Sequence, residues 1–413
     1  MTTRVPIKHL FDVSRNMIMP VEYGNEPLFH YSLPAWHEHG DGLIENASDL
    51  ASGKLLLKGG EVLVSKLNPE KSAVLLAESH DMPTVCSPEF IALVPKNIDR
   101  QFAFYFMLSG PLRHQLNASV ESVTNSHKRA RVDRFLASNV HLPDLTTQRQ
   151  IADFLDRETA RIDLLIEKKQ RLVDVIKTKL DGQIFELITA GLENTYIDGS
   201  VDLGWRRGVP ERWHVRKVKH LFRLVTDPAP KNNNYELLSV YSAIGVRPRK
   251  DLEERGNKAS TTDGYWRVKK GDIIVNKLLA WMGAIGVSEY SGVTSPAYDI
   301  LRPTRRLEPH YYHYLFRIPR FSKELKRHSR GIMEMRLRLY FENFGRILVP
   351  VPPIDEQREI VAALRSEDAK HDVLSKKIGL SIDRLKEYRS ALITAAVTGQ
   401  IDVGSYTKSG ASE

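Results

Sequence analysis

Two long stretches of the chain carry apolar residues at helical spacing. In residues 146–190 and 355–398, apolar residues recur at intervals of three, four or seven, with charged residues between them. This spacing predicts two long amphipathic helices, each of which packs against another helix. At ~1.5 Å per residue, each helix would span roughly 60 Å. The stripe that we expect to pack on a partner helix consists of Ile151, Leu155, Ile162, Leu165, Leu172, Ile360, Leu364, Leu374, Leu385 and Leu392.

Both helices begin with nearly the same signature. The first is LPDLTTQRQIADFL at residues 142–155, and the second is VPPIDEQREIVAAL at residues 351–364. Each has a proline-marked exit from the preceding region, then an N-cap candidate, Thr146 or Asp355, and then a Gln-Arg pair. A polar N-cap followed by an amphipathic run is the usual start of a helix.

The regions before the two signatures also match one another in order. IKHLF at residues 7–11 matches VKHLF at an offset of 211, and GEVLVSKL at residues 60–67 matches GDIIVNKL at the same offset. CSPEFIALVP at residues 86–95 matches TSPAYDILRP at an offset of 208, and the signatures match at 209. The chain is therefore one unit written twice, and duplication should be recognised before single motifs are interpreted.

The short segments of the two globular regions predict mixed α/β domains. GEVLVSKL and FIALVP in the first region, and GDIIVNK and AYDILRP in the second, are rich in β-branched residues and predict strands. Residues 101–108 fit either a helix or a strand, whereas residues 310–321 favour a helix. A polar, basic stretch follows in each region, at residues 125–135 and 327–341.

These patterns predict the architecture. A helix this long cannot bury its stripe on one small domain, so we expect the two helices to pack antiparallel. The expected fold class is α+β: two mixed α/β domains separated by two long antiparallel coiled-coil helices, with a pseudo-two-fold internal repeat. The expected boundaries are a first domain at 1–145, a helix at 146–192, a linker at 193–210, a second domain at 211–353, a helix at 354–400 and a disordered tail at 401–413.

The spacing within the helices differs between the repeats. The start signatures align at an offset of 209, but the LITA sequences near the helix ends, at residues 187–190 and 392–395, align at 205. The second helix is therefore expected to be four residues shorter, which is about one turn. A difference of one turn keeps the apolar stripe in phase.

Charge and cysteine content narrow the partners and the compartment. The chain has 60 Lys and Arg against 51 Asp and Glu, a formal net charge of +9, which favours a polyanionic partner such as nucleic acid. A single cysteine excludes an intrachain disulfide and favours a reducing compartment. The first residues lack the apolar core of a signal peptide, and no apolar run reaches ~18 residues. We therefore expect a cytoplasmic protein that does not enter a membrane.

The familiar catalytic and cofactor motifs are absent from the sequence. There is no phosphate-binding loop with a Gly-Lys-Ser/Thr end, and no glycine-rich loop after a strand suggests a nucleotide or S-adenosylmethionine site. His37, His39 and Asp41 lie close together, but their spacing fits a surface loop better than a metal site. Cys86 has no identifiable base nearby, which argues against a nucleophile. We expect no catalytic residue, no metal and no cofactor in this chain.

Basic residues recur at equivalent places and predict DNA contacts. Lys66 and Lys277 end equivalent strands, where a lysine is well placed to contact phosphate. Each basic stretch could neutralise phosphates, and an arginine within it could bind guanine bidentately. A solvated basic face is the alternative interpretation. The predicted DNA-binding residues are Lys66, Lys128, Arg129, Arg131, Lys277, Arg330, Arg336 and Arg338.

With these features, the chain resembles the specificity subunit of Type I restriction-modification enzymes. The resemblance lies in the repeated proline, Gln-Arg and LITA pattern and in the closing ALITAAVTGQIDV at residues 391–403, and it covers nearly the whole chain. The globular domains match that family only in outline. The shorter second helix leaves the spacer length open.

The resemblance implies a function in phage defence. Each domain would be a target recognition domain that reads one half of a split double-stranded DNA target. The helices would set the spacer and dock two modification (methyltransferase) subunits, which carry S-adenosylmethionine and methylate adenine N6. Restriction subunits with ATP- and Mg-dependent translocase and endonuclease activity would join them. This chain would be the non-catalytic specificity subunit. The rival hypotheses are a coiled-coil scaffold with protein-binding globular ends and a stand-alone enzyme.

Overall fold

The computed structural model describes residues 3–69, 73–122, 128–193, 197–251, 262–332 and 336–404. Contacts divide the chain into two units. The first contains residues 1–170 and 378–413, and the second contains residues 171–377. Each unit therefore holds one globular domain and parts of both long helices, α5 (Leu145–Ala190) and α9 (Ile354–Val397). Part of the expected disordered tail, residues 405–413, lies outside the described residues.

The first domain contains two main sheets. One is antiparallel, in the order β2-β10-β7-β8, and the other is mixed, in the order β3-β6-β9-β4-β5, with β4 and β9 parallel. The first sheet consists of β2 (Phe11–Val13), β10 (Phe90–Pro95), β7 (Val62–Ser65) and β8 (Val74–Leu76). The second consists of β3 (Met17–Ile18), β6 (Lys54–Leu57), β9 (Thr84–Cys86), β4 (Pro27–Tyr31) and β5 (Leu43–Asn46). Two strand pairs complete the domain: β1 (Thr3–Pro6) with β13 (Asn139–Leu142), and β11 (Val120–Ser122) with β12 (Lys128–Ala130).

The second domain repeats the antiparallel sheet. Its strands follow the order β17-β24-β21-β22, which matches β2-β10-β7-β8 strand for strand. They are β17 (Phe222–Val225), β24 (Tyr298–Pro303), β21 (Ile273–Asn276) and β22 (Ile285–Val287). The pair β16 (His214–Lys217) with β25 (Leu348–Val351) matches β1 with β13. The other described pairs are β18 (Leu238–Tyr241) with β19 (Gly245–Pro248), and β20 (Trp266–Val268) with β23 (Gly292–Thr294).

Short helices cover the sheets. The ambiguous segment at 101–108 is a helix, α2 (Arg100–Leu108), because the Asp99 side chain caps it by accepting a hydrogen bond from the Phe102 amide at 3.0 Å. The other helices of the first domain are α1 (Leu33–His39), α3 (Gly110–Ala118) and α4 (Val132–Ala137), and those of the second are α6 (Pro309–Leu315), α7 (Pro319–His328) and α8 (Phe341–Phe344). The single-turn helices are Ile7–His9, Pro20–Tyr23, Ala47–Asp49, Val218–His220, Arg249–Asp251 and Ala280–Met282.

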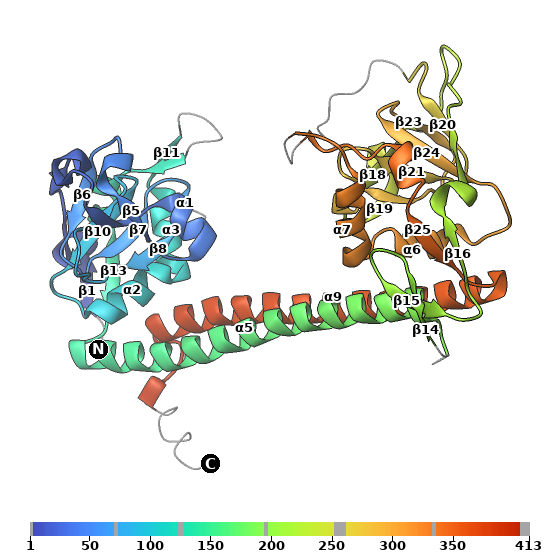
Figure 1. Cartoon of the computed structure of the whole chain (residues 1–413). Helices are drawn as coiled ribbons and strands as arrows, with labels where there is room; N and C mark the ends of the chain where they lie inside the picture. The colour runs from blue at the N-terminus through green and yellow to red at the C-terminus, as the bar shows by residue number, and fades with distance from the viewer. Residues whose placement is uncertain are drawn as a thin grey trace. The chain divides into compact units, whose positions relative to one another are not determined.

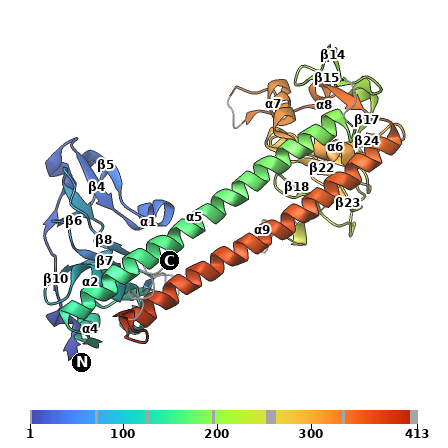
Figure 2. The same cartoon turned by 90° about the horizontal axis from the view of Figure 1, so that it is seen from below.

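The two long helices are antiparallel within each unit. In the first unit the start of α5 lies beside the end of α9, where Arg389 pairs with Asp163 at 3.0 Å (Figures 1 and 2). In the second unit the end of α5 shares a core with the start of α9, through Ile188 and Ile360. The internal repeat and the antiparallel pairing of the sequence-based prediction are confirmed.

The helix boundaries correct two details of the prediction. Asp144, not Thr146, caps α5, because its carboxylate accepts a hydrogen bond from the Thr147 amide at 3.0 Å. That bond holds the pKa of Asp144 below its usual range. Asp355 lies inside the first turn of α9 and is not the N-cap. The helices contain 46 and 44 residues, so they differ by two residues and not four, because α9 continues past its LITA sequence.

The expected linker contains regular secondary structure. Residues 197–210 form a hairpin of β14 (Ile197–Asp202) and β15 (Arg207–Pro210). Leu203 and Val209 within it are buried, as is Trp213 beyond it. This segment therefore belongs to the second unit as a structural part.

Candidate nucleic-acid interface

A side-chain-capped turn fixes each of the two strand-end lysines. After β7, the Ser65 hydroxyl accepts a hydrogen bond from the Leu67 amide at 3.2 Å. After β21, the Asn276 side-chain oxygen accepts one from the Leu278 amide at 3.1 Å. Serine and asparagine favour such turns because their short side chains reach the backbone two residues on. The small polar residue before each lysine thus ends the strand at the same point in both domains.

The same lysines connect to the predicted basic stretches. The Ala130 amide donates to the Lys66 carbonyl at 2.8 Å, and the Leu339 amide donates to the Lys277 carbonyl at 2.8 Å. Ala130 and Leu339 are separated by 209 residues, the offset of the signatures. In each unit the structure therefore brings the strand-end lysine and the basic stretch together. The sequence had predicted the two features separately.

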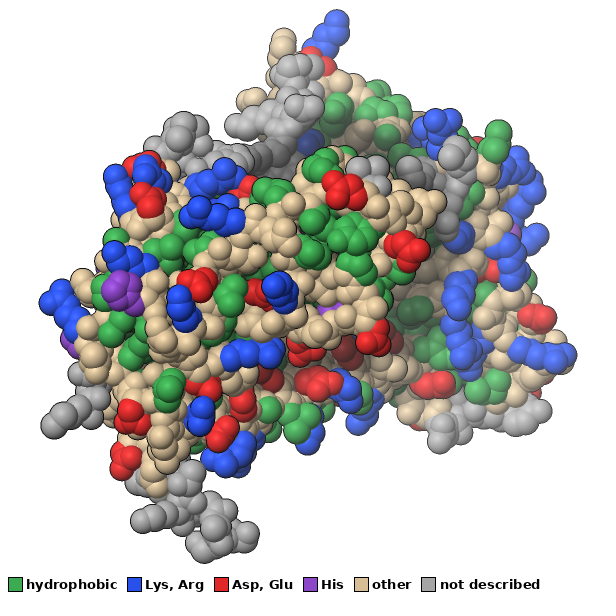
Figure 3. All heavy atoms as spheres, turned by 90° about the vertical axis from the view of Figure 1, so that its left-hand side faces the viewer, with side chains coloured by type: hydrophobic (Ala, Val, Ile, Leu, Met, Phe, Trp, Pro, Cys, Tyr) green, Lys and Arg blue, Asp and Glu red, His purple; other side chains and the backbone are tan. Residues whose placement is uncertain are grey.

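In the first unit, acidic neighbours engage the basic stretch. Arg129 pairs with Glu89, and Arg131 bonds Asp133 at 2.7 Å and Glu121 at 3.1 Å. The hydrogen bonds from Arg131 lower the pKa of Asp133 to about 2. These pairs are exposed and individually weak, so phosphate could compete with the carboxylates. Figure 3 shows the same mixture, with basic side chains interspersed among acidic ones on the near face of this unit.

In the second unit, fewer acidic neighbours engage the basic stretch. The backbones of Arg330 and Arg338 exchange two hydrogen bonds at 2.9 Å, which hold the two residues opposite one another. Their side chains and that of Arg336 are exposed, and within the described residues no ion pair joins these three arginines to a carboxylate. Lys277 differs, because it pairs with Asp299 at 3.2 Å. Burial raises the pKa of Asp299.

Neither of the other candidate chemistries gains support. His37 and His39 lie on α1, where the His37 ring packs on Trp36. Across the described ranges, no group of three or more His, Cys, Asp or Glu side chains could hold a metal ion. Cys86 is fully buried in β9, and burial raises the pKa of its thiol to about 12, which keeps it protonated at neutral pH. Within the same ranges, no helix is both long enough and apolar enough to cross a membrane.

The helices bury only part of the predicted stripe. Near the globular domains, the residues of this group are buried or partly buried: Ile151, Leu155, Ile162, Ile360, Leu364, Leu385 and Leu392. Leu165, Leu172 and Leu374 are 42–47% exposed. Those three lie in the central parts of the helices, where the domains of the two units no longer cover them. Two helices packed alone bury one narrow seam, so residues beside that seam stay exposed.

Sequence reasoning missed the contacts that hold each domain on its helix. The sequence identified Gln148 and Gln357 only as part of the repeated signature, with no structural role, yet both side chains are buried. Two tyrosines separated by the same offset of 209 also bind the helices. Tyr105 donates to Asp156 of α5 at 2.6 Å, and Tyr314 donates to Asp368 of α9 at 2.5 Å. The recurrence of tyrosine at this offset was the available signal.

The repeated fold, with one lysine and one basic stretch held together in each domain, defines a protein built from two related globular domains. The family model of the Type I restriction modification DNA specificity domain matches residues 51–173 and residues 210–382, once in each repeat. The chain belongs to this family, and the resemblance found in the sequence is confirmed.

Individual relatives agree with this assignment. The chain is 24% identical over 321 residues to the specificity subunit of the Type I restriction enzyme EcoBI of Escherichia coli. That match covers 72% of this chain and 65% of the relative's length. Two solved structures share the fold. One comes from a study of complex assembly and conformational transition of the type I restriction-modification system, with a TM-score of 0.69, 15% identity and coverage of 96% and 97%. The other is the HsdS subunit of Thermoanaerobacter tengcongensis, with a TM-score of 0.51, 14% identity and coverage of 97% of both chains.

Proposed function

We propose that this chain is the non-catalytic specificity subunit of a Type I restriction-modification complex and reads a bipartite DNA target, one half-site per domain. The observation that carries this proposal is the recurrence, in both units, of a strand-end lysine bonded to a basic stretch. Such a group combines phosphate neutralisation with arginines that can reach base edges. Lys66, Lys128, Arg129 and Arg131 would serve one half-site, and Lys277, Arg330, Arg336 and Arg338 the other.

The helices supply the docking surface for the other subunits. In the first unit, Leu164, Leu165, Leu380 and Tyr388 are exposed on α5 and α9. In the second, Leu172, Val175, Val373 and Leu374 are exposed on the same two helices. Large exposed apolar side chains on a helix pair favour a protein partner. Two modification subunits would cover these side chains, one for each repeat, and restriction subunits would join outside them.

The chemistry would reside in the partners. The modification subunits would bind S-adenosylmethionine and methylate adenine N6 after extruding the base from the duplex. The restriction subunits would use ATP and Mg²⁺. This chain would hold none of these ligands, and its role would be to select the sequence and position the methyltransferases.

A gel shift with the reconstituted chain and modification subunit tests DNA recognition. The duplex carries the bipartite site found by methylation mapping of the host genome, and its matched control has both half-sites scrambled. We expect the mapped site to bind at least about 10³-fold more tightly than the control, the lower end of specific recognition. Equal binding of the two duplexes would favour the rival, a scaffold with protein-binding ends. Methyl transfer by the purified chain alone would instead establish a stand-alone enzyme.

A domain exchange tests whether each domain reads one half-site. Replacing residues 1–145 with a foreign recognition domain should change one half-site of the methylated sequence and leave the other half intact. A change in both halves would contradict independent reading by the two domains.

A further inference from the structure

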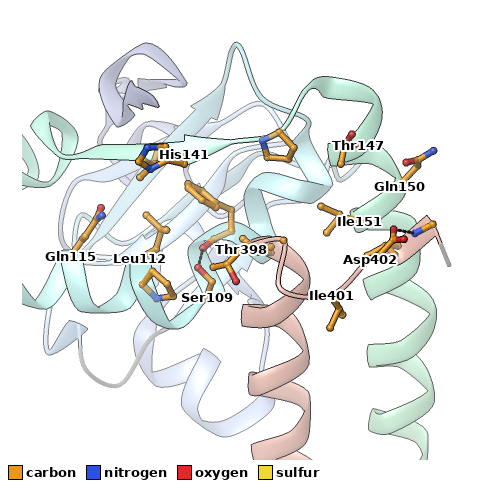
Figure 4. A pocket seen from close by; sticks show the side chains of 18 of the residues that line it. Ser109, Leu112, Gln115, His141, Thr147, Gln150, Ile151, Thr398, Ile401 and Asp402 are labelled. Atoms are coloured by element: carbon orange, nitrogen blue, oxygen red, sulfur yellow. Dashed lines mark hydrogen bonds between the residues drawn. The ribbon is translucent and has the colours of Figure 1, made fainter. Parts of the chain in front are cut away.

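A pocket of about 680 Å³ lies within the first unit, between α3, β13, the start of α5 and the segment after α9 (Figure 4). Leu112 and Gln115 line one side, and Thr147 and Ile151 line another. Ile401 and Asp402, from the end of the chain, line a third side. The proposed DNA interface does not use this pocket.

The internal repeat continues past the helices into the segment that borders this pocket. GSVDLG at residues 199–204 matches GQIDVG at residues 399–404. The Asp202 carboxylate accepts a hydrogen bond from the Gly204 amide at 2.8 Å, and the Asp402 carboxylate accepts one from the Gly404 amide at 3.0 Å. The apolar residue between each pair is buried in its unit. The same turn therefore follows both helices.

In the second unit two tryptophans follow this turn. Trp205, directly after Gly204, packs edge-on against Phe321 with ring centroids 5.1 Å apart. Its indole N–H donates to the Leu348 carbonyl at 2.9 Å. Trp213 donates its indole N–H to Glu356 at 2.9 Å. Together they occupy the angle between the domain and the helix ends.

The pocket of the first unit lies at the equivalent place. Subtracting the offset of 209 from Phe321, Leu348 and Glu356 gives Leu112, Asn139 and Thr147. All three of the resulting residues line the pocket. In the sequence, serine follows Gly404 where tryptophan follows Gly204. The first unit thus presents the site of the two indoles, and its sequence has serine at the position of the first of them.

Polar atoms in the pocket indicate what it would accept. The Gln115 side-chain oxygen is buried and has no hydrogen-bond partner among the described residues. The Asn139 carbonyl, which corresponds to the acceptor of Trp205, receives a long bond of 3.4 Å from the Gln115 side-chain nitrogen. An indole N–H would supply the missing donor.

The charges indicate a difference between the two sites. In the second unit Glu356 also pairs with Arg212 at 2.8 Å. Its counterpart in the first unit is Thr147, whose hydroxyl bonds Asp144. The site therefore offers an aromatic ring an apolar surface and a neutral acceptor, and threonine replaces the carboxylate that pairs with Arg212 in the second unit.

We propose that this pocket is a docking site for a tryptophan-bearing extended segment of a partner protein. The indole lies on Leu112, and its N–H bonds the Asn139 carbonyl or the Gln115 side chain. The segment takes the place in the first unit that residues 205–213 take in the second.

A labelled peptide with the sequence of residues 199–213 of this chain serves as the probe. We expect fluorescence anisotropy to show one peptide bound per full-length chain. The Trp205→Ala, Trp213→Ala peptide should bind at least about tenfold more weakly, because the buried aromatic surface is lost. In the chain, Gln115→Trp fills the pocket from α3 and should weaken binding at least about tenfold. The matched control Asn117→Trp places the same ring on an exposed position of α3 and should leave the affinity within about twofold.

Several results would overturn the proposal. The first is the absence of peptide binding to both the full chain and a chain that ends at Gly404. Binding that Gln115→Trp does not weaken, with thermal melting confirming that the variant folds, would place the peptide elsewhere. Binding that appears only when residues 405–413 are removed would assign the pocket to the chain's own end and not to a partner.

Discussion

Gln148 joins the start of α5 to the start of α2. Its side-chain oxygen accepts a hydrogen bond from the Asp99 amide at 2.8 Å, and its side-chain nitrogen donates to the Pro143 carbonyl at 2.9 Å. In the other repeat, Gln357 accepts from the Glu308 amide at 2.9 Å and donates to the Pro352 carbonyl at 2.8 Å. One buried amide thus fixes the angle at which each domain meets the helix that follows it.

Gln148→Leu should destabilise the first unit by roughly 2–4 kcal/mol, because it leaves a buried amide and a carbonyl unpaired. Urea unfolding monitored by circular dichroism measures the loss. Arg149→Ala is the control, because Arg149 is 70% exposed and its 3.8 Å contact with Asp99 should contribute little. Equal effects of the two substitutions would contradict the role assigned to Gln148.

The three exposed arginines of the second unit should carry much of the salt dependence of DNA binding. Replacing Arg330, Arg336 and Arg338 with alanine should reduce the slope of log K against log [salt] by up to about 3. The slope is measured with the reconstituted complex on its mapped duplex. Replacing the ion-paired Arg131 should have a smaller effect, because its carboxylates already neutralise it. A slope that stays unchanged in the triple variant would remove these residues from the interface.

The helices would act as a ruler for the spacer between half-sites. Adding four residues within residues 168–180 lengthens α5 by ~6 Å. Because α5 packs antiparallel on α9, a matched insertion of four residues within residues 368–378 should keep the two seams together. The preferred spacer should then grow by one or two base pairs, as read by methylation mapping. If the spacer stays unchanged in a complex that still methylates, the length of the helices does not set the spacer.

His313 should make the second unit sensitive to acid. Its ring packs against Gly286 and accepts a hydrogen bond from the Val287 amide at 3.3 Å, and burial lowers its pKa to about 3. The unfolded chain would bind this proton near pH 6.5, so stability is complete above that pH and falls as the pH decreases toward the folded pKa.

The expected loss is roughly 2 kcal/mol by pH 5. Urea unfolding at pH 7.5 and pH 5 measures it, and His313→Gln, which cannot take up the proton, should reduce the difference between the two conditions. His37→Gln, on α1 of the first domain, is the control. If His313→Gln and the parent lose the same stability, protonation of His313 is not the cause.

Much of the fold could be predicted because it is encoded in local patterns. The helical spacing and its repetition identified α5 and α9 to within about one residue at their starts, and the β-branched segments identified β7, β10, β21 and β24. The helix α2 remained ambiguous in the sequence, because its run of apolar residues, most of them buried, has no clear period. The N-cap formed by the Asp99 side chain explains why this segment is a helix.

The remaining features depend on contacts between distant residues. Nothing local distinguishes Leu155, which is buried beneath the first domain, from Leu165, which is 42% exposed. Both lie on the same stripe, and only the position of the domain separates them. The bond between the Ala130 amide and the Lys66 carbonyl is likewise invisible in the sequence, which predicted the lysine and the basic stretch only as separate features.

The division of the helices between the units has a consequence for synthesis on the ribosome. The second unit is one continuous segment, residues 171–377, whereas the core of the first unit includes Ile393 and Val397, near the end of the chain. The first domain is therefore translated first, but its core is completed last. Until Ile393 and Val397 have been translated, the apolar face of α2 and α5 that these residues cover is open to chaperones or to a second nascent chain.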